Sequence, residues 1–380
     1  MMQHKTALTL VCLGLMCGHV VTVFHSVTLF HICLLLIVLM AIYRTLTRPH
    51  EMTKLFYSVA SFYLIYAFWT YMATLICPQE ADFKAITKFL IIPILVVSLL
   101  RLLLVSPRDS LRIFFIASIA YYVLSLMIGY VEYFTGWHLP TTNHLGTTGL
   151  YYDVNSYSVL LVMAALFIFA YCDHFITTKR RLMGFLPLVA CLPLLVWNRC
   201  MTGLVVIVLA IIVHFMLKIR NRKVVVAILS SAAILFVTTV ILLWDIVIPR
   251  LQIYALSLYS LYDSFGLGYG VNGDSYYMSL VNNYDITKGL TNAHSYLLQI
   301  PLTSGLVVFV LYCLIIARIM RSSASRGRNL FWIMPLLYLL LLFSPSSSLM
   351  LWTHYIFFCS YICYAVANNN DSTIMNCGHA

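Results

Sequence analysis

Two arginines and one histidine stand at the borders of long apolar segments, where they could bind phosphate and move a proton. Arg199 and Arg250 each border such a segment, and a charge beside hydrocarbon is costly and usually has a partner. A guanidinium presents a planar fork that suits phosphate oxygens, although it also binds lipid headgroups without specificity. His294 begins another apolar segment, where a neutral imidazole is either a general base or an ordinary hydrogen-bonding group. These three residues are the candidates for catalysis.

Further polar residues lie at the start of other apolar segments. Asp153 and Asn155 precede one of them, where either residue type is the expected helix N-cap, and the functional alternative is a role in orienting a polar substrate. His354 begins the last apolar segment and is the second histidine kept as a candidate. Neither paired carboxylates nor a Cys/His cluster with metal-ligand spacing is evident, so we expect chemistry without a tightly held metal.

The elements that carry these residues belong to an integral membrane protein. Apolar residues make up 62% of the 380 residues and charged residues 9%, and the mean hydropathy is +0.94. A membrane span needs about 17–25 mostly apolar residues, which leaves little sequence for a soluble domain. The net charge of +11 would suit nucleic acid in a soluble protein. Because the basic residues here occupy short loops, positive-inside topology is the better interpretation, and no nucleic-acid partner is expected.

Hydropathy predicts an all-α polytopic protein, with a single transmembrane domain over residues 1–380 and about twelve spans. The N-terminal apolar run has no cleavage site, which indicates a retained first span. The eleven cysteines are interpreted as small packing residues, and pairing of Cys77 with Cys200 stays open. The predicted spans are 6–24, 26–43, 55–76, 88–106, 113–134, 154–175, 183–198, 203–217, 224–245, 294–317, 329–348 and 353–367.

The basic residues orient these spans. With both termini in the cytoplasm, eighteen of the 23 Lys and Arg residues fall on the cytoplasmic side and five on the outer side. One missed span would invert every later loop and remove this bias. The five outer residues are Lys84, Lys88, Arg199, Arg250 and Lys288.

One connection is long, the outer loop 246–292 between predicted spans nine and ten. A structureless loop of this length is uncommon unless it is functional. Apolar residues recur at helical spacing after Pro249, which predicts an interfacial amphipathic helix that ends near Tyr262. A glycine-rich turn follows at 266–273. The apolar residues of the predicted helix are Leu251, Tyr254, Leu258 and Leu261.

Four sequence elements resemble, in the same order, those of the integral membrane O-antigen polymerases and O-antigen ligases. They are GLYYDVNSYS at 149–158, NRCMTGL at 198–204, Arg250 followed by GLGYG at 266–270, and NAHSYL with a later SG at 292–305. The resemblance covers residues 149–320. Val154 stands where the family usually has proline, and Ser295 where it usually has asparagine.

The resemblance implies a glycosyltransferase-C-like fold in the bacterial cytoplasmic (inner) membrane and a role in lipopolysaccharide or surface-polysaccharide biosynthesis. Family members transfer a glycan from undecaprenyl diphosphate to a sugar hydroxyl on the outer, periplasmic face, with inversion and without a cofactor. Arg199 and Arg250 would stabilise the departing diphosphate, and His294 would deprotonate the acceptor. The sugar-binding residues would be Asp153, Asn155, Tyr269, Tyr276 and Tyr277.

The acceptor separates the functions that this resemblance allows. A polymerase adds the glycan to a lipid-linked repeat unit, and we favour it over a ligase, which adds it to a lipid A core. The implied partners are the undecaprenyl-diphosphate-linked oligosaccharide, membrane lipids, a chain-length regulator and a flippase. A glycolipid flippase or transporter that forms no bond stays open as a second alternative. Against it, the polar residues gather at one face, and no symmetric pair of interrupted helices is evident.

Overall fold

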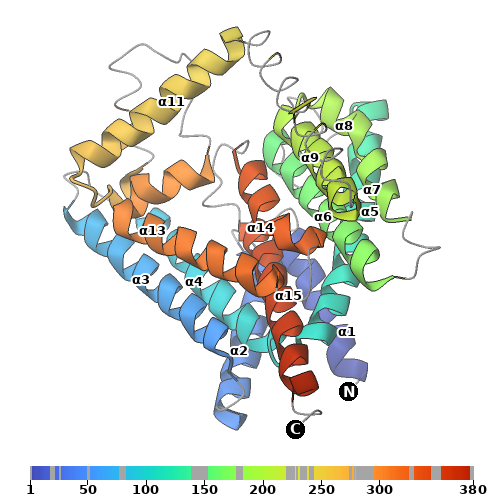
Figure 1. Ribbon diagram of the computed structural model, residues 1–380. Helices are drawn as coiled ribbons and strands as arrows, with labels where there is room; N and C mark the ends of the chain where they lie inside the picture. Colours follow the sequence, from blue (N-terminus) through green and yellow to red (C-terminus); the bar gives the residue numbers. More distant parts are fainter. Residues whose placement is uncertain are drawn as a thin grey trace.

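The computed structural model describes residues 2–17, 22–24, 27–48, 52–76, 83–137, 153–176, 183–219, 227, 230–231, 238, 244–273, 276–277, 279, 295–324, 329–343 and 352–376. Helices dominate this part of the chain, beside one short antiparallel pair of strands, β1 (Thr22–Phe24) and β2 (Val27–Thr28). Figure 1 shows a helix bundle with both termini at one end and α11 (Trp244–Asp263) at the other. These are called the termini end and the α11 end below.

The other elements follow the chain in the order in which Figure 1 colours them. They are α1 (Met2–Cys17), α2 (Leu29–Thr47), α3 (Lys54–Ile76), α4 (Phe83–Leu103), α5 (Pro107–Thr135), α6 (Val154–Phe175), α7 (Phe185–Ala190), α8 (Leu192–Trp197), α9 (Met201–Lys218), the 3-10 turn η2 (Gly270–Asn272), α13 (Tyr296–Ala324), α14 (Leu330–Leu341) and α15 (Trp352–Asn376).

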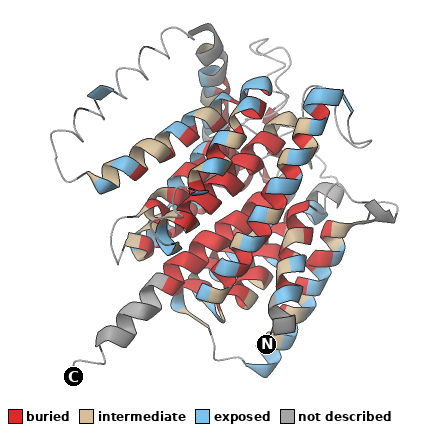
Figure 2. Cartoon of the chain, turned by 90° about the vertical axis from the view of Figure 1, so that its right-hand side faces the viewer, coloured by how far each residue is buried: buried red, intermediate tan, exposed pale blue. Residues whose placement is uncertain are grey.

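Seven of the described helices are long and apolar enough to cross a membrane, namely α2, α3, α4, α5, α6, α9 and α13. Their exposed faces are apolar too. On α3, Leu64, Phe68, Tyr71 and Leu75 are exposed at the spacing of one helix face, as expected for a face that contacts lipid. Figure 2 shows exposed residues on the outward faces of the helices and buried residues through the middle of the bundle. The chain is therefore a polytopic helical membrane protein.

Polar contacts show which helix ends meet at the termini end. Arg101, near the end of α4, donates to backbone carbonyls at the end of α2. Arg318, late in α13, donates to Ser58, early in α3, at 2.7 Å. Lys218, the last residue of α9, donates to Asp173 of α6 at 3.1 Å. Helices α2, α4, α6, α9 and α13 therefore finish at the termini end, and α3 begins there.

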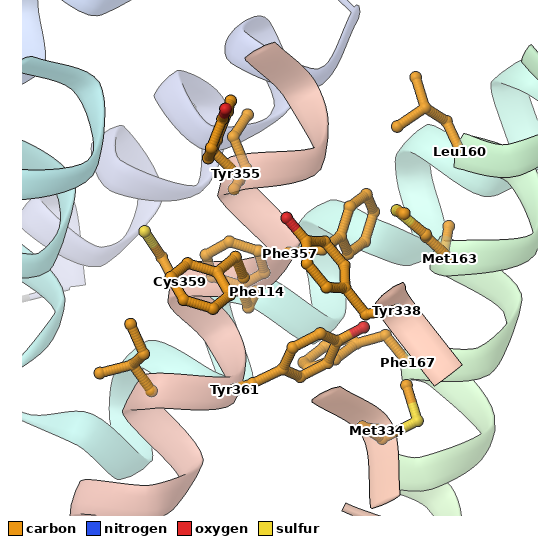
Figure 3. Packing of buried hydrophobic residues seen from close by; sticks show 14 of the residues in the cluster. Phe114, Leu160, Met163, Phe167, Met334, Tyr338, Tyr355, Phe357, Cys359 and Tyr361 are labelled. Atoms are coloured by element: carbon orange, nitrogen blue, oxygen red, sulfur yellow. The ribbon is translucent and has the colours of Figure 1, made fainter. Parts of the chain in front are cut away.

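Aromatic side chains fill the middle of the bundle. Tyr338 of α14 and Tyr361 of α15 meet edge to face with ring centroids 5.9 Å apart. Phe114 of α5 and Phe167 of α6 also lie edge to face, at 5.9 Å. Figure 3 shows these four side chains converging on one region of the core. Because lipid tails are as apolar as these side chains, van der Waals packing, rather than escape from water, holds such helices together.

Eleven of the twelve predicted spans overlap a helix or a pair of helices, whereas the ninth, 224–245, lies almost wholly outside the described residues. The sequence prediction is wrong in several boundaries. The first span ends at Cys17, and predicted span 183–198 is two helices that meet at Cys191, where Pro193 has no N–H to continue the first helix. The predicted span 294–317 is interrupted at Gly305. Helix α11 begins at Trp244, before Pro249.

Candidate functional site

Helix α11 ends in the glycine-rich turn that the sequence predicts. Asp263 is the last residue of the helix. Gly266, Gly268 and Gly270 follow with φ of 76°, 81° and 65°, left-handed conformations that glycine adopts at little cost. Three such residues so close together reverse the chain and direct it back toward the bundle.

The glycine-rich turn fits a break in α13. Gly305 has φ of 73° and ψ of −178°, so the helix stops and restarts there, and backbone groups on both sides lose their helical partners. The N–H of Leu306 donates to the carbonyl of Gly266 at 2.8 Å, and the N–H of Tyr269 donates to the carbonyl of Leu302 at 2.8 Å. The turn and the broken helix therefore satisfy each other's backbone groups.

Helix α3 closes the other side of the turn. Trp69 Nε1 donates to the carbonyl of Leu267 at 3.2 Å, and the N–H of Val271 donates to Thr74 Oγ1 at 3.0 Å. The approach is close, because a Cβ atom on Gly270 would lie 2.1 Å from Thr74 Oγ1. The sequence places glycine where no larger residue fits between the turn and α3.

Two tyrosines share one carboxylate at this turn. The hydroxyls of Tyr269 and Tyr276 both donate to Oδ2 of Asp263. The two rings are stacked, with centroids 3.7 Å apart and planes inclined by 17°. Tyr269 is 8% exposed, whereas Tyr276 is half-buried and Asp263 is exposed. This group, called the tyrosine–aspartate cluster below, therefore offers one accessible ring and one accessible carboxylate.

Hydrogen bonding fixes the charge state of the cluster. The hydroxyl of Tyr269, and after it that of Tyr276, lowers the pKa of Asp263 by stabilising the carboxylate. Burial raises the pKa of Tyr269 and of Tyr276, and the hydrogen bonds to Asp263 raise both further. Near neutral pH the cluster thus holds one anion and two neutral phenols. A carboxylate with a lowered pKa is a weak base, so the cluster is suited to binding.

Tyr277 lies beneath the tyrosine–aspartate cluster. It is fully buried and packs with Ile253 and Leu256 of α11 and with Leu302 of α13. Its ring therefore supports the cluster from the inside and has no face open to a ligand in this structure.

Arg199 lies in the tight turn between α8 and α9, with φ of 53°. Its exposed side chain lines an open cavity of about 670 Å³ together with Tyr133, Pro193, Val196 and Trp197. The rings of Tyr133 and Trp197 meet edge to face at 4.8 Å. A cavity with one cation and apolar, aromatic walls is suited to a phosphate that carries an apolar tail.

Neighbouring contacts hold the Arg199 turn against α6. Asn198 Nδ2 donates to Ser158 Oγ at 3.0 Å in a buried position, and the N–H of Cys200 donates to the carbonyl of Leu195 at 2.9 Å. The thiol of Cys200 is buried. Cys77, its possible disulfide partner in the sequence analysis, lies outside the described residues.

Asp153 is the N-cap of α6, and its Oδ1 accepts from the N–H of Ser156 at 2.9 Å. The N-cap interpretation of Asp153 is therefore observed. Asn155 is half-buried in the first turn of the same helix. Both residues lie near the Arg199 turn, because Ser158, in the same helix, accepts a hydrogen bond from Asn198, the residue before Arg199.

The three histidine and arginine candidates that remain differ in how they are placed. His294 lies outside the described residues, and Arg250 belongs to α11, with a side chain that lies outside them as well. Their proposed roles stay predictions. His354 is fully buried in α15, with Nδ1 2.5 Å from the hydroxyl of Tyr338, and is thus a hydrogen-bonded core histidine.

The described candidates form two groups at the α11 end. The tyrosine–aspartate cluster lies where α11, α3 and α13 meet, and Arg199 lies between α8 and α9 with Asp153 and Asn155 nearby. Figure 1 shows these sets of helices on opposite sides of the bundle. The structure therefore does not bring Arg199 into contact with the tyrosines.

Two carboxylates to which the sequence analysis gives no role belong to these groups. Asp263 is central to the cluster, and its signal in the sequence was an acid just before a glycine-rich turn with tyrosines. Glu132, in the last turn of α5, is 2% exposed and precedes Tyr133, which lines the Arg199 cavity. A buried carboxylate near the end of a membrane span is a functional candidate.

The fold and these two groups define a polytopic helical membrane protein with polar sites at one end of its bundle. No protein-family model matches the chain, and no curated protein matches its sequence. Among the described residues, no three His, Cys, Asp or Glu side chains lie together as metal ligands would.

Proposed function

We propose that the chain is an O-antigen polymerase of the bacterial inner membrane. It transfers a growing glycan from undecaprenyl diphosphate to the non-reducing-end sugar of a lipid-linked repeat unit, with inversion and without a metal. The donor and the stereochemistry come from the resemblance of the four sequence elements. The observation that carries the proposal is the tyrosine–aspartate cluster at the α11 end.

The tyrosine–aspartate cluster has the chemistry that carbohydrate binding requires. A sugar ring presents apolar C–H faces and polar hydroxyl edges. The accessible ring of Tyr276 suits the first, and the carboxylate of Asp263, which accepts charge-assisted hydrogen bonds, suits the second. Because the cluster is built on the end of α11 and a tightly packed turn, it is held in place before any ligand binds.

The Arg199 cavity suits the other part of the donor. A polyprenyl diphosphate joins an anionic headgroup to an apolar tail, and this cavity joins one guanidinium to apolar walls. When the glycan leaves, negative charge develops on the diphosphate, and a cation already aimed at it lowers the barrier. The proposal gives this role to Arg199 and to Arg250.

His294 has the role of base in this proposal, and it accepts the proton of the acceptor hydroxyl as the new glycosidic bond forms. The lowered pKa of Asp263 makes that carboxylate a poor base, which supports a binding role for it. Asp153 and Asn155 complete the sugar-binding residues beside Arg199.

We further propose twelve spans, cytoplasmic termini and a periplasmic α11 end. Helix α9 ends at Lys218, which contacts Asp173 at the termini end, whereas α11 lies at the opposite end of the bundle (Figure 1). Residues 219–243 therefore connect opposite ends of the bundle, which supports a ninth span between α9 and α11. The clustering of basic residues at the termini end supports its cytoplasmic location.

A glycolipid transporter is the second candidate, and the break in α13 is the observation that favours it. Interrupted helices in transporters bind substrates or ions with the backbone groups that the break frees. In α13, the N–H of Leu306 and the carbonyl of Leu302 instead bind the glycine-rich turn. That pairing gives the break a structural use and supports the polymerase over the transporter. A ligase shares every feature above and differs in its acceptor.

The test uses a strain that lacks this gene and is complemented with wild type, Arg199→Asn or Arg199→Lys. Surface glycan is resolved on a gel beside blots for glycan on polyprenyl lipid. Asparagine tolerates the left-handed backbone of Arg199 but removes the charge. We expect normal protein levels and polymer synthesis reduced about 100-fold or more, as for the loss of one group that stabilises a transition state. Lysine keeps the charge without the fork and should restore synthesis in part.

The gene-deletion strain separates the candidate functions. Core carrying a single repeat unit is the expected result for a polymerase. Bare core with long chains accumulating on polyprenyl lipid would identify a ligase instead. An unchanged ladder would contradict both, whereas bare core without long lipid-linked chains would favour the transporter.

A further inference from the structure

Helix α11 has a second apolar face that no described residue covers. One face, with Ile253, Leu256, Ser257 and Ser260, is buried. The other exposes Leu251, Leu258 and Tyr262, with exposed fractions of 50%, 56% and 81%, and Phe265 follows at 94%. These four residues are called the α11 ridge below. If it stays in water, each of these large apolar side chains lacks the stabilisation of about 1.5–3 kcal/mol that burial would give.

Phe265 is held in this position by a strained backbone. Its φ is 52°, a left-handed conformation that costs a residue with a side chain about 1–2 kcal/mol. The N–H groups of Phe265 and Gly266 donate to the carbonyls of Tyr262 and Leu261 at 3.0 and 2.9 Å, which closes the end of α11. In this left-handed conformation the ring of Phe265 points away from the protein.

The neighbours of Phe265 give its position relative to the membrane. The carbonyl of the adjacent Gly266 accepts a hydrogen bond from the N–H of Leu306, where the second part of α13 begins. From that point α13 exposes a lipid-facing stripe of Leu306, Val310 and Leu314, with exposed fractions of 48%, 48% and 60%. Phe265 thus lies at the first turn of a membrane-facing helix surface.

The contact with α3 also places Phe265 beside a lipid-facing surface. Leu267 accepts from Trp69, which lies seven residues before the last residue of α3, or about 10 Å along the helix axis. The lipid-facing residues Phe68 and Tyr71 flank Trp69. The α11 ridge is therefore continuous with lipid-facing surfaces on two sides.

We propose that the α11 ridge is inserted into the leaflet at the α11 end, with Phe265 among the lipid acyl chains. Irregular backbone is tolerated at that depth only where its polar groups are satisfied, and Gly266, Leu267 and Tyr269 pair with α13 or α3. Asp263, two residues before Phe265, is then held at the level of the lipid headgroups. The inference is independent of the proposed enzymatic function.

The test places a fluorescent amino acid, acridonylalanine, at position 265 of the full chain in phosphatidylcholine vesicles. Emission is measured with lipids that carry a doxyl quencher high on the acyl chain and, separately, with aqueous iodide. We expect the doxyl lipid to remove most of the emission and iodide to remove little. Because Phe265 is almost fully exposed, the larger ring should not disturb folding. A second label at Tyr262 gives an independent reading one turn away.

Two control positions show how a lipid-facing label and a water-facing label behave. The same label at Phe68, on the lipid-facing surface of α3, should show the pattern expected at 265. The label at Gln252, an exposed polar position on α11, should respond to iodide instead. A label at 265 that behaves like the one at 252 would overturn the proposal. Resistance to both quenchers would also overturn it, because the ridge would then be covered by protein, such as a second copy of the chain.

Discussion

Asp263 ends α11, where the partial negative charge of the helix C-terminus disfavours an acid by roughly 0.3–1 kcal/mol. Two phenol hydrogen bonds to the same carboxylate oxygen offset this cost. A neutral residue at the end of α11 would avoid this cost. The cluster therefore retains a charged group in spite of the unfavourable helix terminus. Asp263 is therefore the first residue to substitute.

We predict that Asp263→Asn lowers polymer synthesis about tenfold or more, because a charged hydrogen bond to a sugar hydroxyl contributes roughly 1.5 kcal/mol or more. Tyr276→Phe, which keeps the ring and removes one hydroxyl, should have a smaller effect. Both are measured by glycan ladders at equal protein level. If the asparagine variant made wild-type amounts of polymer, Asp263 would have no part in the reaction.

The pKa of Asp263 also predicts a pH dependence. Because hydrogen bonding lowers its folded pKa below the unfolded value of about 3.9, the carboxylate stabilises the fold above that pH. The stabilisation is lost as the pH falls through the folded pKa. The Tm difference between wild type and Asp263→Asn in detergent should therefore be constant near neutral pH and shrink below about pH 4. A difference that grew on acidification would contradict the hydrogen-bonded carboxylate.

At the scale of elements, the glycine-rich turn and the break in α13 depend on each other. A Cβ atom on Gly268 would lie 2.6 Å from the backbone nitrogen of Gly305 and 2.8 Å from the carbonyl oxygen of Thr303. We predict that Gly268→Ala destabilises the protein by about 2–5 kcal/mol, as the sum of left-handed strain and overpacking. Thermal unfolding in detergent measures the effect.

Gly136 offers a matched control for Gly268→Ala. Its φ of 68° is also left-handed, but a Cβ atom there meets nothing within 4 Å. Gly136→Ala should therefore cost only the backbone strain, about 1–2 kcal/mol. Equal losses of stability in the two variants would show that the turn does not pack against α13 as described.

The sequence predicts elements better than it predicts their interruptions. Long apolar runs identify the spans, because hydrocarbon thickness sets a minimum length, and the helical spacing after Pro249 identifies α11. The break at Gly305 escapes this reasoning, because hydropathy continues through it and the broken hydrogen bonds find partners 33 to 40 residues earlier in the chain. Asp263 lies only 6 and 13 residues from its two tyrosines, but its role escapes the sequence because only the folded turn brings both hydroxyls to one carboxylate oxygen.

At the scale of the whole molecule, the proposed topology can be tested with reporter fusions in a bacterial host. We predict that green fluorescent protein fused after residue 380 is fluorescent, because the proposed topology places that end in the cytoplasm. Alkaline phosphatase fused after residue 274 should be active, and the same enzyme fused after residue 222 should be inactive. Activity at 222 together with inactivity at 274 would invert the orientation.

The pairing of the glycine-rich turn with α3 and α13 also has a consequence for motion. Thr70 and Ser304 add a direct contact between the two helices, with their hydroxyl oxygens 2.5 Å apart. A slide of α3 along α13 by even one helical turn would leave several of these groups unpaired at once. These contacts therefore oppose a slide of the two helices past each other. Under the proposed function, we therefore expect any opening of the molecule during glycan transfer in the helices on the other side, where the Arg199 cavity lies.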